Sequence, residues 1–132
     1  MALDQVSLIV PARSEYAKTV RMTAAELGSR LGMSYDDVDD VRMATEEAFV
    51  YASACVGESE PIGFTFTVAE DELTVLVGPL PEIGCGDADT TPEDRYAAFI
   101  LESVCDTYEV LRSSGTCTLR LVKRVSDTTP KE

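Results

Sequence analysis

Two neighbouring stretches of the sequence restrict the fold most. In residues 62–68, apolar side chains alternate with smaller or polar ones, which is the pattern of a strand. An acidic turn follows, and residues 73–77 are then almost entirely apolar. A run of that kind predicts a second strand that is buried on both faces, with Leu76 fully inside the core.

Two helical patterns precede this pair of strands. Residues 6–10 are rich in β-branched side chains and predict a first strand. From Ser14, apolar residues recur at steps of three and four up to a stop at Gly32. Ser34 and Asp37 then form a pair like a capping box, which predicts the start of the second helix.

The last third of the chain predicts one more helix and two more strands. Residues 78–91 are rich in glycine, proline and aspartate and indicate a loop, after which Pro92 begins a helix. Residues 108–111 and 116–123 have the composition and alternation of strands. One face of the third helix is expected to carry Tyr96, Phe99, Ile100, Ser103 and Val104.

The order of these elements predicts the fold class. It is strand, two helices, two strands, loop, helix and two strands, which favours an α/β protein of the two-layer α/β sandwich type. One mixed, mostly antiparallel sheet is expected, covered on one face by three helices. The 132 residues suit one domain, which we assign to residues 1–125, with residues 126–132 as a flexible tail.

Composition narrows the function classes. The chain has 24 acidic and 11 basic residues and a net charge of −13, which disfavours nucleic acid and membrane as direct partners and would attract a basic protein. Taken alone, such acidity is explained as well by solubility. The chain has no histidine, so catalysis by a Ser-His-Asp or Cys-His arrangement is excluded. It shows neither a signal-peptide pattern nor an apolar run of bilayer length, so we expect a cytoplasmic protein.

Three segments carry a resemblance to a known family. The segments PARSE (residues 11–15), DDVRMATEEA (residues 39–48) and FILESVCD (residues 99–106) resemble the anti-sigma-factor serine kinases, which belong to the GHKL superfamily of ATPases. The similarity extends over most of the chain and is most specific in residues 39–48. It implies the Bergerat, or histidine-kinase-like ATPase, fold. It also implies a sigma factor or an anti-anti-sigma protein with a STAS domain as partner, and it leaves a homodimer open.

The first ATP motif of that family is a helix that carries a glutamate and, four residues later, an asparagine. The glutamate activates the attack on the γ-phosphate and the asparagine holds Mg²⁺. Glu47 matches the glutamate, but Tyr51 stands in place of the asparagine, and a phenol is a poor ligand for Mg²⁺. Glu47 is therefore either a catalytic residue or a solvated helix carboxylate, and the change at Tyr51 favours the second interpretation.

The other three ATP motifs are altered to different degrees. Gly78 stands where the family has the aspartate that reads adenine, and Leu80 replaces the glycine that follows. The stretch that matches the phosphate-binding loop, residues 93–98, contains no glycine. The final Gly-Thr pair is retained as Gly115 and Thr116, although the same pair is common where a strand leaves a hairpin.

Two functions follow from the resemblance. The first is an anti-sigma-factor-like regulator that binds and sequesters its partner with little or no ATP binding and no cofactor. The alternative is an active serine/threonine-protein kinase that uses ATP and Mg²⁺ to phosphorylate a STAS-domain protein. In that case Gly84, Gly86 and Asp87 are the first candidates to replace the altered motifs.

One residue is a candidate for partner binding. Arg21 matches the arginine of the first helix that contacts the partner in the family. A second interpretation is an exposed arginine that pairs with Glu15 or Glu26. No metal site is expected, because the aspartates of residues 36–40 are more simply explained as favourable charge at a helix N-terminus.

Overall fold

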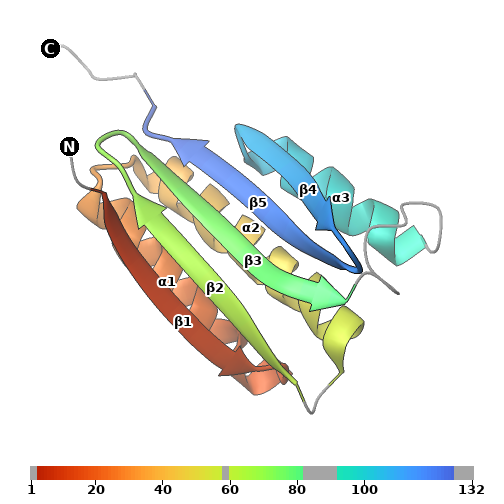
Figure 1. Ribbon diagram of the computed structural model, residues 1–132. Helices are drawn as coiled ribbons and strands as arrows, with labels where there is room; N and C mark the ends of the chain where they lie inside the picture. The colour runs from red at the N-terminus through yellow and green to blue at the C-terminus, as the bar shows by residue number, and fades with distance from the viewer. Residues whose placement is uncertain (1–2, 58–59, 82–91, 127–132) are drawn as a thin grey trace, which may run out of the picture.

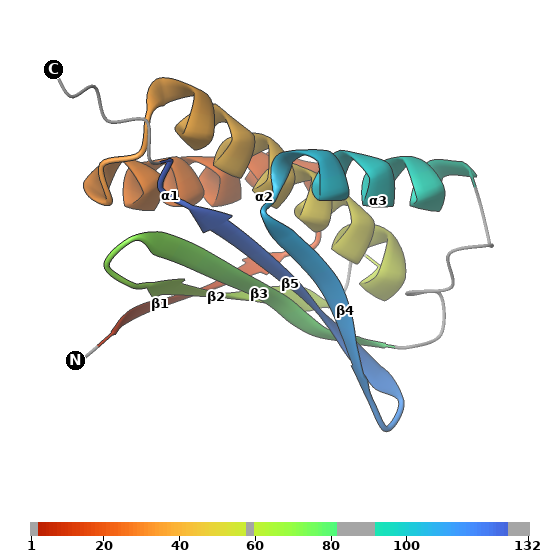
Figure 2. The ribbon, with the colours of Figure 1, turned by 90° about the horizontal axis from the view of Figure 1, so that it is seen from above.

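The protein, seen in a computed structural model that describes residues 3–57, 60–81 and 92–126, has a helical layer on one face of a sheet (Figures 1 and 2). For residues 92–95 only the backbone is described. A short 3₁₀ helix, η1, leads into the first α-helix. The elements are β1 (Asp4–Pro11), η1 (Ser14–Tyr16), α1 (Ala17–Arg30), α2 (Tyr35–Val56), β2 (Pro61–Val68), β3 (Glu72–Pro81), α3 (Pro92–Val104), β4 (Thr107–Ser113) and β5 (Thr116–Arg124).

The sheet has the strand order β1-β2-β3-β5-β4, and each pairing that the structure describes is antiparallel. The α/β fold class, with helices on one face of the sheet, is thus confirmed. The sheet is more regular than expected, because no parallel pair occurs among these strands. Helix α2 lies between α1 and α3 in the helical layer (Figure 2).

The core lies between the two layers. On β2, Phe64 and Phe66 are 1% and 0% exposed and stack on each other, with ring centroids 6.2 Å apart. Phe49 of α2 packs against Phe64 at 6.3 Å, which joins the helical layer to the middle of the sheet. The helices contribute mostly small side chains to this contact, which lets them approach the sheet closely. These include Val20, Ala24, Val41, Ala44, Ala48 and Ala52.

Helix α2, the longest element, begins as the sequence predicts. Ser34 is its N-cap, and the Ser34 hydroxyl accepts a hydrogen bond from the backbone N–H of Asp37 at 3.1 Å. The helix ends at Val56, ahead of Gly57. None of the helices in the described residues combines the length and the apolar character needed to cross a membrane.

Strand β3 differs from the prediction. Its burial alternates, so that Leu73, Val75 and Val77 are at most 3% exposed whereas Leu76 is only half-buried. The expectation that Leu76 is fully buried is wrong, because helices cover one face of the sheet and Leu76 lies on the other. A continuous apolar run therefore does not require two covered faces.

Helix α3 also differs from the prediction. Ala97 and Leu101 are the residues that it buries, at 5% and 1% exposure. Tyr96 and Phe99, which the sequence placed with the other large side chains, are 62% and 64% exposed. Among the described side chains, the face that packs on the molecule is therefore the one with Ala97 and Leu101 and not the one with the two rings.

Two leucines of β3 test this account of the sheet. Leu73→Ala removes a side chain that is 1% exposed and should lower the free energy of unfolding by about 2–5 kcal/mol, because a cavity replaces it. Leu76→Ala, three residues along the same strand, should lower it by roughly 1 kcal/mol, since water reaches that face. Urea denaturation of both variants measures the difference, and equal losses would contradict one-sided burial.

Candidate functional site

Helix α2 places Glu47 and Tyr51 one turn apart on the same face. Tyr51 is half-buried and packs against the core. Glu47 is also half-buried, and this burial raises the pKa of its carboxyl, with a further increase from the neighbouring negative charge of Glu46. The two residues thus occupy the relative positions that the resemblance implies, with a phenol where an amide is expected.

Arg21 of α1 lies close to Glu46 of α2, the residue before Glu47. Its Nη1 atom is 3.1 Å from Oε1 of Glu46, and the two side chains are 30% and 41% exposed. Glu15 and Glu26, the partners expected from the sequence, pair with other arginines. Arg21 therefore bridges α1 to α2 at the surface, beside the stretch of α2 that most resembles the family.

Gly78 lies inside β3 and not after it. The strand continues to Pro81 through a β-bulge between Val77 and Leu80. Gly78 has a φ of +139°, and a Cβ atom added to it would lie 3.0 Å from the backbone oxygen of Cys117 on β5. An L side chain at this position would be strained and would collide with β5, so an aspartate cannot reach a ligand from here.

Gly115 and Thr116 belong to a tight hairpin. Ser114 and Gly115 both have positive φ, 39° and 87°, which is typical of a two-residue turn between antiparallel strands. The hydroxyl of Thr116 donates to the backbone oxygen of Ser113 at 2.9 Å. The requirements of the hairpin are therefore sufficient to explain the Gly-Thr pair.

The fold brings most of these positions to one end of the molecule (Figure 1). The C-terminal end of α2, the end of β3 and the β4–β5 hairpin lie on the same side, and Pro81 pairs with Thr116. Gly84, Gly86 and Asp87 lie outside the described residues. Among those that are described, no group of three or more Cys, Asp or Glu side chains is arranged to hold a metal ion. Tyr51 and Gly78 do not fit Mg-ATP in the way that the resemblance assigns to their positions.

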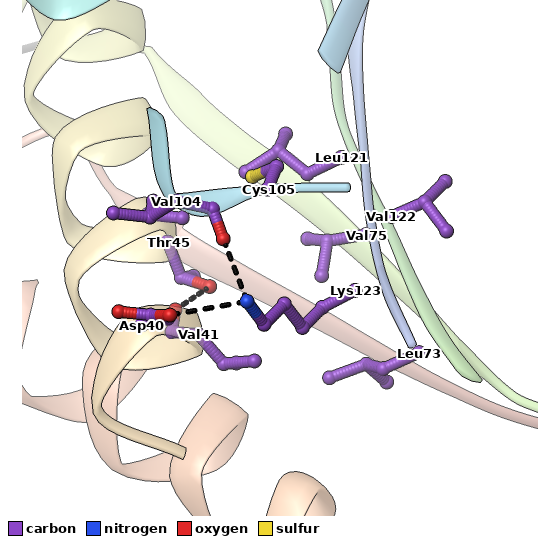
Figure 3. A pocket seen from close by; sticks show the side chains of 11 residues that line it. Asp40, Val41, Thr45, Leu73, Val75, Val104, Cys105, Leu121, Val122 and Lys123 are labelled. Atoms are coloured by element: carbon purple, nitrogen blue, oxygen red, sulfur yellow. Dashed lines mark hydrogen bonds and ion pairs between the residues drawn. The ribbon is translucent and has the colours of Figure 1, made fainter. Parts of the chain in front are cut away.

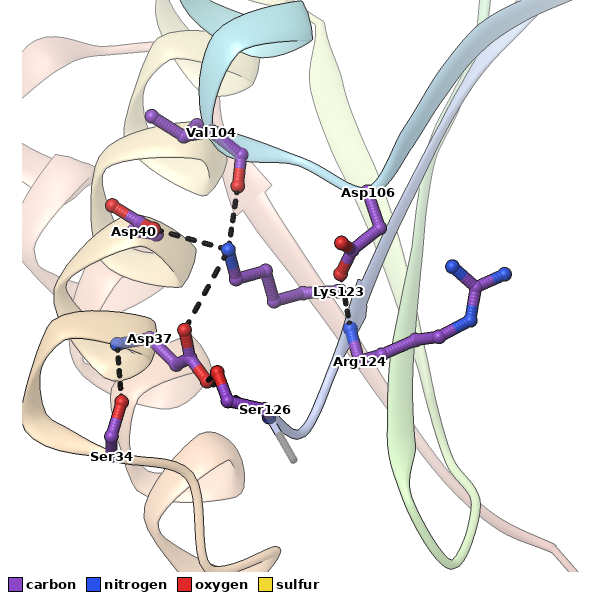
Figure 4. A network of polar contacts seen from close by, with 8 residues as sticks. All are labelled: Ser34, Asp37, Asp40, Val104, Asp106, Lys123, Arg124 and Ser126. Atoms are coloured by element: carbon purple, nitrogen blue, oxygen red, sulfur yellow. Dashed lines mark hydrogen bonds and ion pairs between the residues drawn. The ribbon is translucent and has the colours of Figure 1, made fainter. Parts of the chain in front are cut away.

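A polar network occupies the opposite end of β5 (Figure 4). The ammonium group of Lys123 donates to Oδ2 of Asp40 at 3.0 Å and to the backbone oxygen of Val104 at 2.9 Å, and it lies 3.8 Å from Oδ1 of Asp37. Asp37 also accepts hydrogen bonds from the backbone N–H, at 3.1 Å, and the hydroxyl of Ser126. One side chain thus joins β5 to α2 and to the end of α3.

The charges of this network stabilise one another. Burial alone would lower the pKa of Lys123, but the hydrogen bond to Asp40 and the nearby carboxylates outweigh it and raise the pKa. Burial would likewise raise the pKa of Asp37, but the bonds from Ser126 and the charge of Lys123 hold it below its ordinary value. Sequence analysis missed this network. One pattern could have predicted it: residues 117, 119 and 121 alternate as the buried face of a strand, and Lys123 is the next residue on that face.

A small cavity lies beside the network, between α2 and the sheet (Figure 3). The volume open to the centre of a water molecule is about 10 Å³, which is room for one water at most. Burial raises the pKa of the Cys105 thiol at its wall to about 12, so the thiol stays neutral. The lining of the cavity is mainly apolar and includes Val41, Ala44, Val75, Val104 and Leu121. The cavity is part of the core and is far too small for a nucleotide.

Comparisons with known proteins find relatives that match most of the chain. No protein-family profile matches the chain. The serine-protein kinase RsbW of Halalkalibacterium halodurans is 26% identical over 129 residues, which is 85% of this chain and 78% of that protein. RsbW of Staphylococcus aureus is 28% identical over 85% of this chain and 82% of its own length. These similarities support the resemblance of the chain to the RsbW-type serine kinases of the GHKL superfamily.

A solved structure supports the same fold. A Mycobacterium tuberculosis protein that contains RsbU and RsbW domains superposes with a TM-score of 0.68 at 16% identity. The match covers 92% of this chain and 32% of that longer chain, so this chain spans about a third of it.

The Lys123 network can be tested by removing its cation. Lys123→Met should lower the free energy of unfolding by about 2–4 kcal/mol, since it leaves Asp40 and a backbone oxygen without their donor. The folded pKa of Lys123 is raised, so its contribution is complete below the ordinary value of 10.5 and is lost as pH rises through the folded pKa. The alkaline loss of stability should therefore be smaller in the variant than in the wild type.

Urea denaturation between pH 7 and pH 11 measures both effects. Arg124→Met is the matched control, because Arg124 is the next residue and its pair with Glu72 is largely exposed. An equal loss of stability in the two variants would contradict the network's role.

Proposed function

We propose that this chain is an anti-sigma-factor-like regulator that binds and sequesters a sigma factor or an anti-anti-sigma STAS protein, with little or no ATP binding. Its similarity to RsbW proteins covers about 85% of its length, so the same overall frame is present. We place it in the cytoplasm, where sigma factors act. Its negative charge suits a partner with a basic surface.

The observation that carries this proposal is the position of Gly78. A carboxylate that reads adenine would have to project from this residue, where a Cβ atom would lie only 3.0 Å from the backbone oxygen of Cys117 on β5 and where φ is +139°. The half-buried Tyr51 supports the same conclusion, because its phenol replaces a Mg²⁺ ligand.

The expected effect on ATP affinity is large. Each charge-assisted or metal-mediated contact is worth on the order of 1.5–3 kcal/mol, so losing several of them removes several kcal/mol of binding energy. Every 1.4 kcal/mol is about a tenfold change in affinity, which moves a micromolar site to about millimolar. The net charge of −13 also opposes binding of the ATP anion.

The alternative is an active serine kinase that uses Mg-ATP. One observation favours it: Glu47 is retained, and its raised pKa lies closer to the range that suits a general base. In this alternative, other residues, with Gly84, Gly86 and Asp87 as the first candidates, take over the roles of Tyr51 and Gly78.

Phosphoryl transfer separates the two functions. Wild-type protein incubated with Mg-ATP and a purified STAS-domain partner should leave that partner unphosphorylated, as measured by intact-mass spectrometry. Glu47→Gln should change partner affinity by less than about twofold, because the proposal gives this residue no role in binding. A phosphorylated partner that disappears with Glu47→Gln would establish the kinase.

Arg21 tests the partner surface. Arg21→Ala should weaken binding to the partner by about 1–2 kcal/mol, the range of a modest hot spot, because its guanidinium keeps donors beyond the one that bonds Glu46. Arg30→Ala on the same helix is the control, since Arg30 forms a similar exposed pair with Glu26 at 2.7 Å. Titration calorimetry with the partner compares them, and equal affinities would remove Arg21 from the interface.

A further inference from the structure

Helix α3 packs on the molecule through Ala97 and Leu101 and leaves two aromatic side chains largely exposed to solvent. Ala97 and Leu101 form its buried face, whereas Tyr96 and Phe99 keep 62% and 64% of their surface exposed. Among the side chains of α3 that the structure describes, the two rings are thus not part of the buried face. Each ring is a large apolar surface that a partner can cover.

The rings form one continuous surface. Tyr96 and Phe99 are three residues apart and thus neighbours on the helix, and the half-buried Ile100 lies beside them. Ser103 follows on the same face, and its hydroxyl donates to the backbone oxygen of Phe99 at 2.7 Å. A partner can therefore cover this surface without leaving that donor unpaired. We call Tyr96, Phe99 and Ile100 the α3 patch.

Charge indicates what kind of partner fits the α3 patch. The exposed Glu102 stands one turn after Phe99, and the chain carries 24 acidic residues against 11 basic ones. This charge repels the phosphates of nucleic acids and anionic lipids. A second copy of the chain has the same charge of −13, which also opposes contact between two copies at this face. A protein segment that combines apolar and basic side chains can cover the two rings and also complements the negative charge.

We propose that the α3 patch docks a basic amphipathic helix of a partner protein, with apolar side chains against Tyr96 and Phe99 and lysine or arginine near Glu102. Helices pack through rows of side chains spaced by three and four residues, and the α3 patch has this spacing. Helix α3, which carries the patch, lies across α2 from α1, which carries Arg21, so the two surfaces are on different helices (Figure 2). The proposal rests on the proposed function only for the identity of the partner.

A designed peptide tests the chemistry of the α3 patch directly. The probe is a labelled amphipathic helix of leucine and lysine, titrated with the full chain at about 0.15 M salt, where the Debye length is about 8 Å. Fluorescence anisotropy should show binding by the wild type and at least about tenfold weaker binding by Tyr96→Ser/Phe99→Ser. Ile9→Ser is the control, because Ile9 is 72% exposed on β1 and the change is equally uncharged.

Three results would overturn the proposal: no binding by the wild type, equal binding by the double variant, or equal binding of a leucine–glutamate peptide. Sedimentation that shows a dimer in the wild type and a monomer in the double variant would assign the α3 patch to self-association instead. Thermal unfolding checks that the double variant is folded. If the double variant is unfolded, the single variant Phe99→Ser is used in its place. The tests at Arg21 and of phosphoryl transfer do not involve α3, so either proposal can fail while the other stands.

Discussion

The ammonium group of Lys123 is the point at which the last strand, α2 and the end of α3 meet. Its contacts with Asp40 and with the backbone oxygen of Val104, 3.0 and 2.9 Å long, connect three elements that are far apart in the sequence. A mostly buried charge of this kind is tolerated only when it is paired and hydrogen-bonded. The position of the helical layer over the sheet, and of the surfaces that this layer presents, depends on that arrangement.

The other end of the molecule is governed by backbone geometry. The bulge at Gly78 brings β3 close to β5. Gly63 on β2 leaves space on the other side, because a Cβ atom at Gly63 would lie 3.3 Å from the backbone oxygen of Gly78. These glycines permit close packing of strands at the place where the resemblance implies a nucleotide-reading carboxylate. Close packing of the strands disfavours that carboxylate at Gly78, which is the physical reason for the proposal of binding without phosphoryl transfer.

The sequence predicted the parts of the fold that depend on local chemistry. The cap at Ser34 and the order of strands and helices depend on neighbouring residues, and both are found in the structure. Leu76 and the outward face of α3 were missed because they depend on which surfaces other elements cover. The bulge at Gly78 and the contacts of Lys123 depend on pairing between distant strands and helices, which periodicity along one segment does not reveal.

The central proposal is that this chain keeps the frame of the RsbW proteins that it resembles without their nucleotide chemistry. A calorimetric titration of the purified chain with Mg-ATP tests that claim most directly. The account predicts no measurable heat of binding at micromolar concentrations, because Tyr51 and Gly78 supply neither a good Mg²⁺ ligand nor a carboxylate for adenine. Binding at micromolar affinity that requires Mg²⁺ would contradict it.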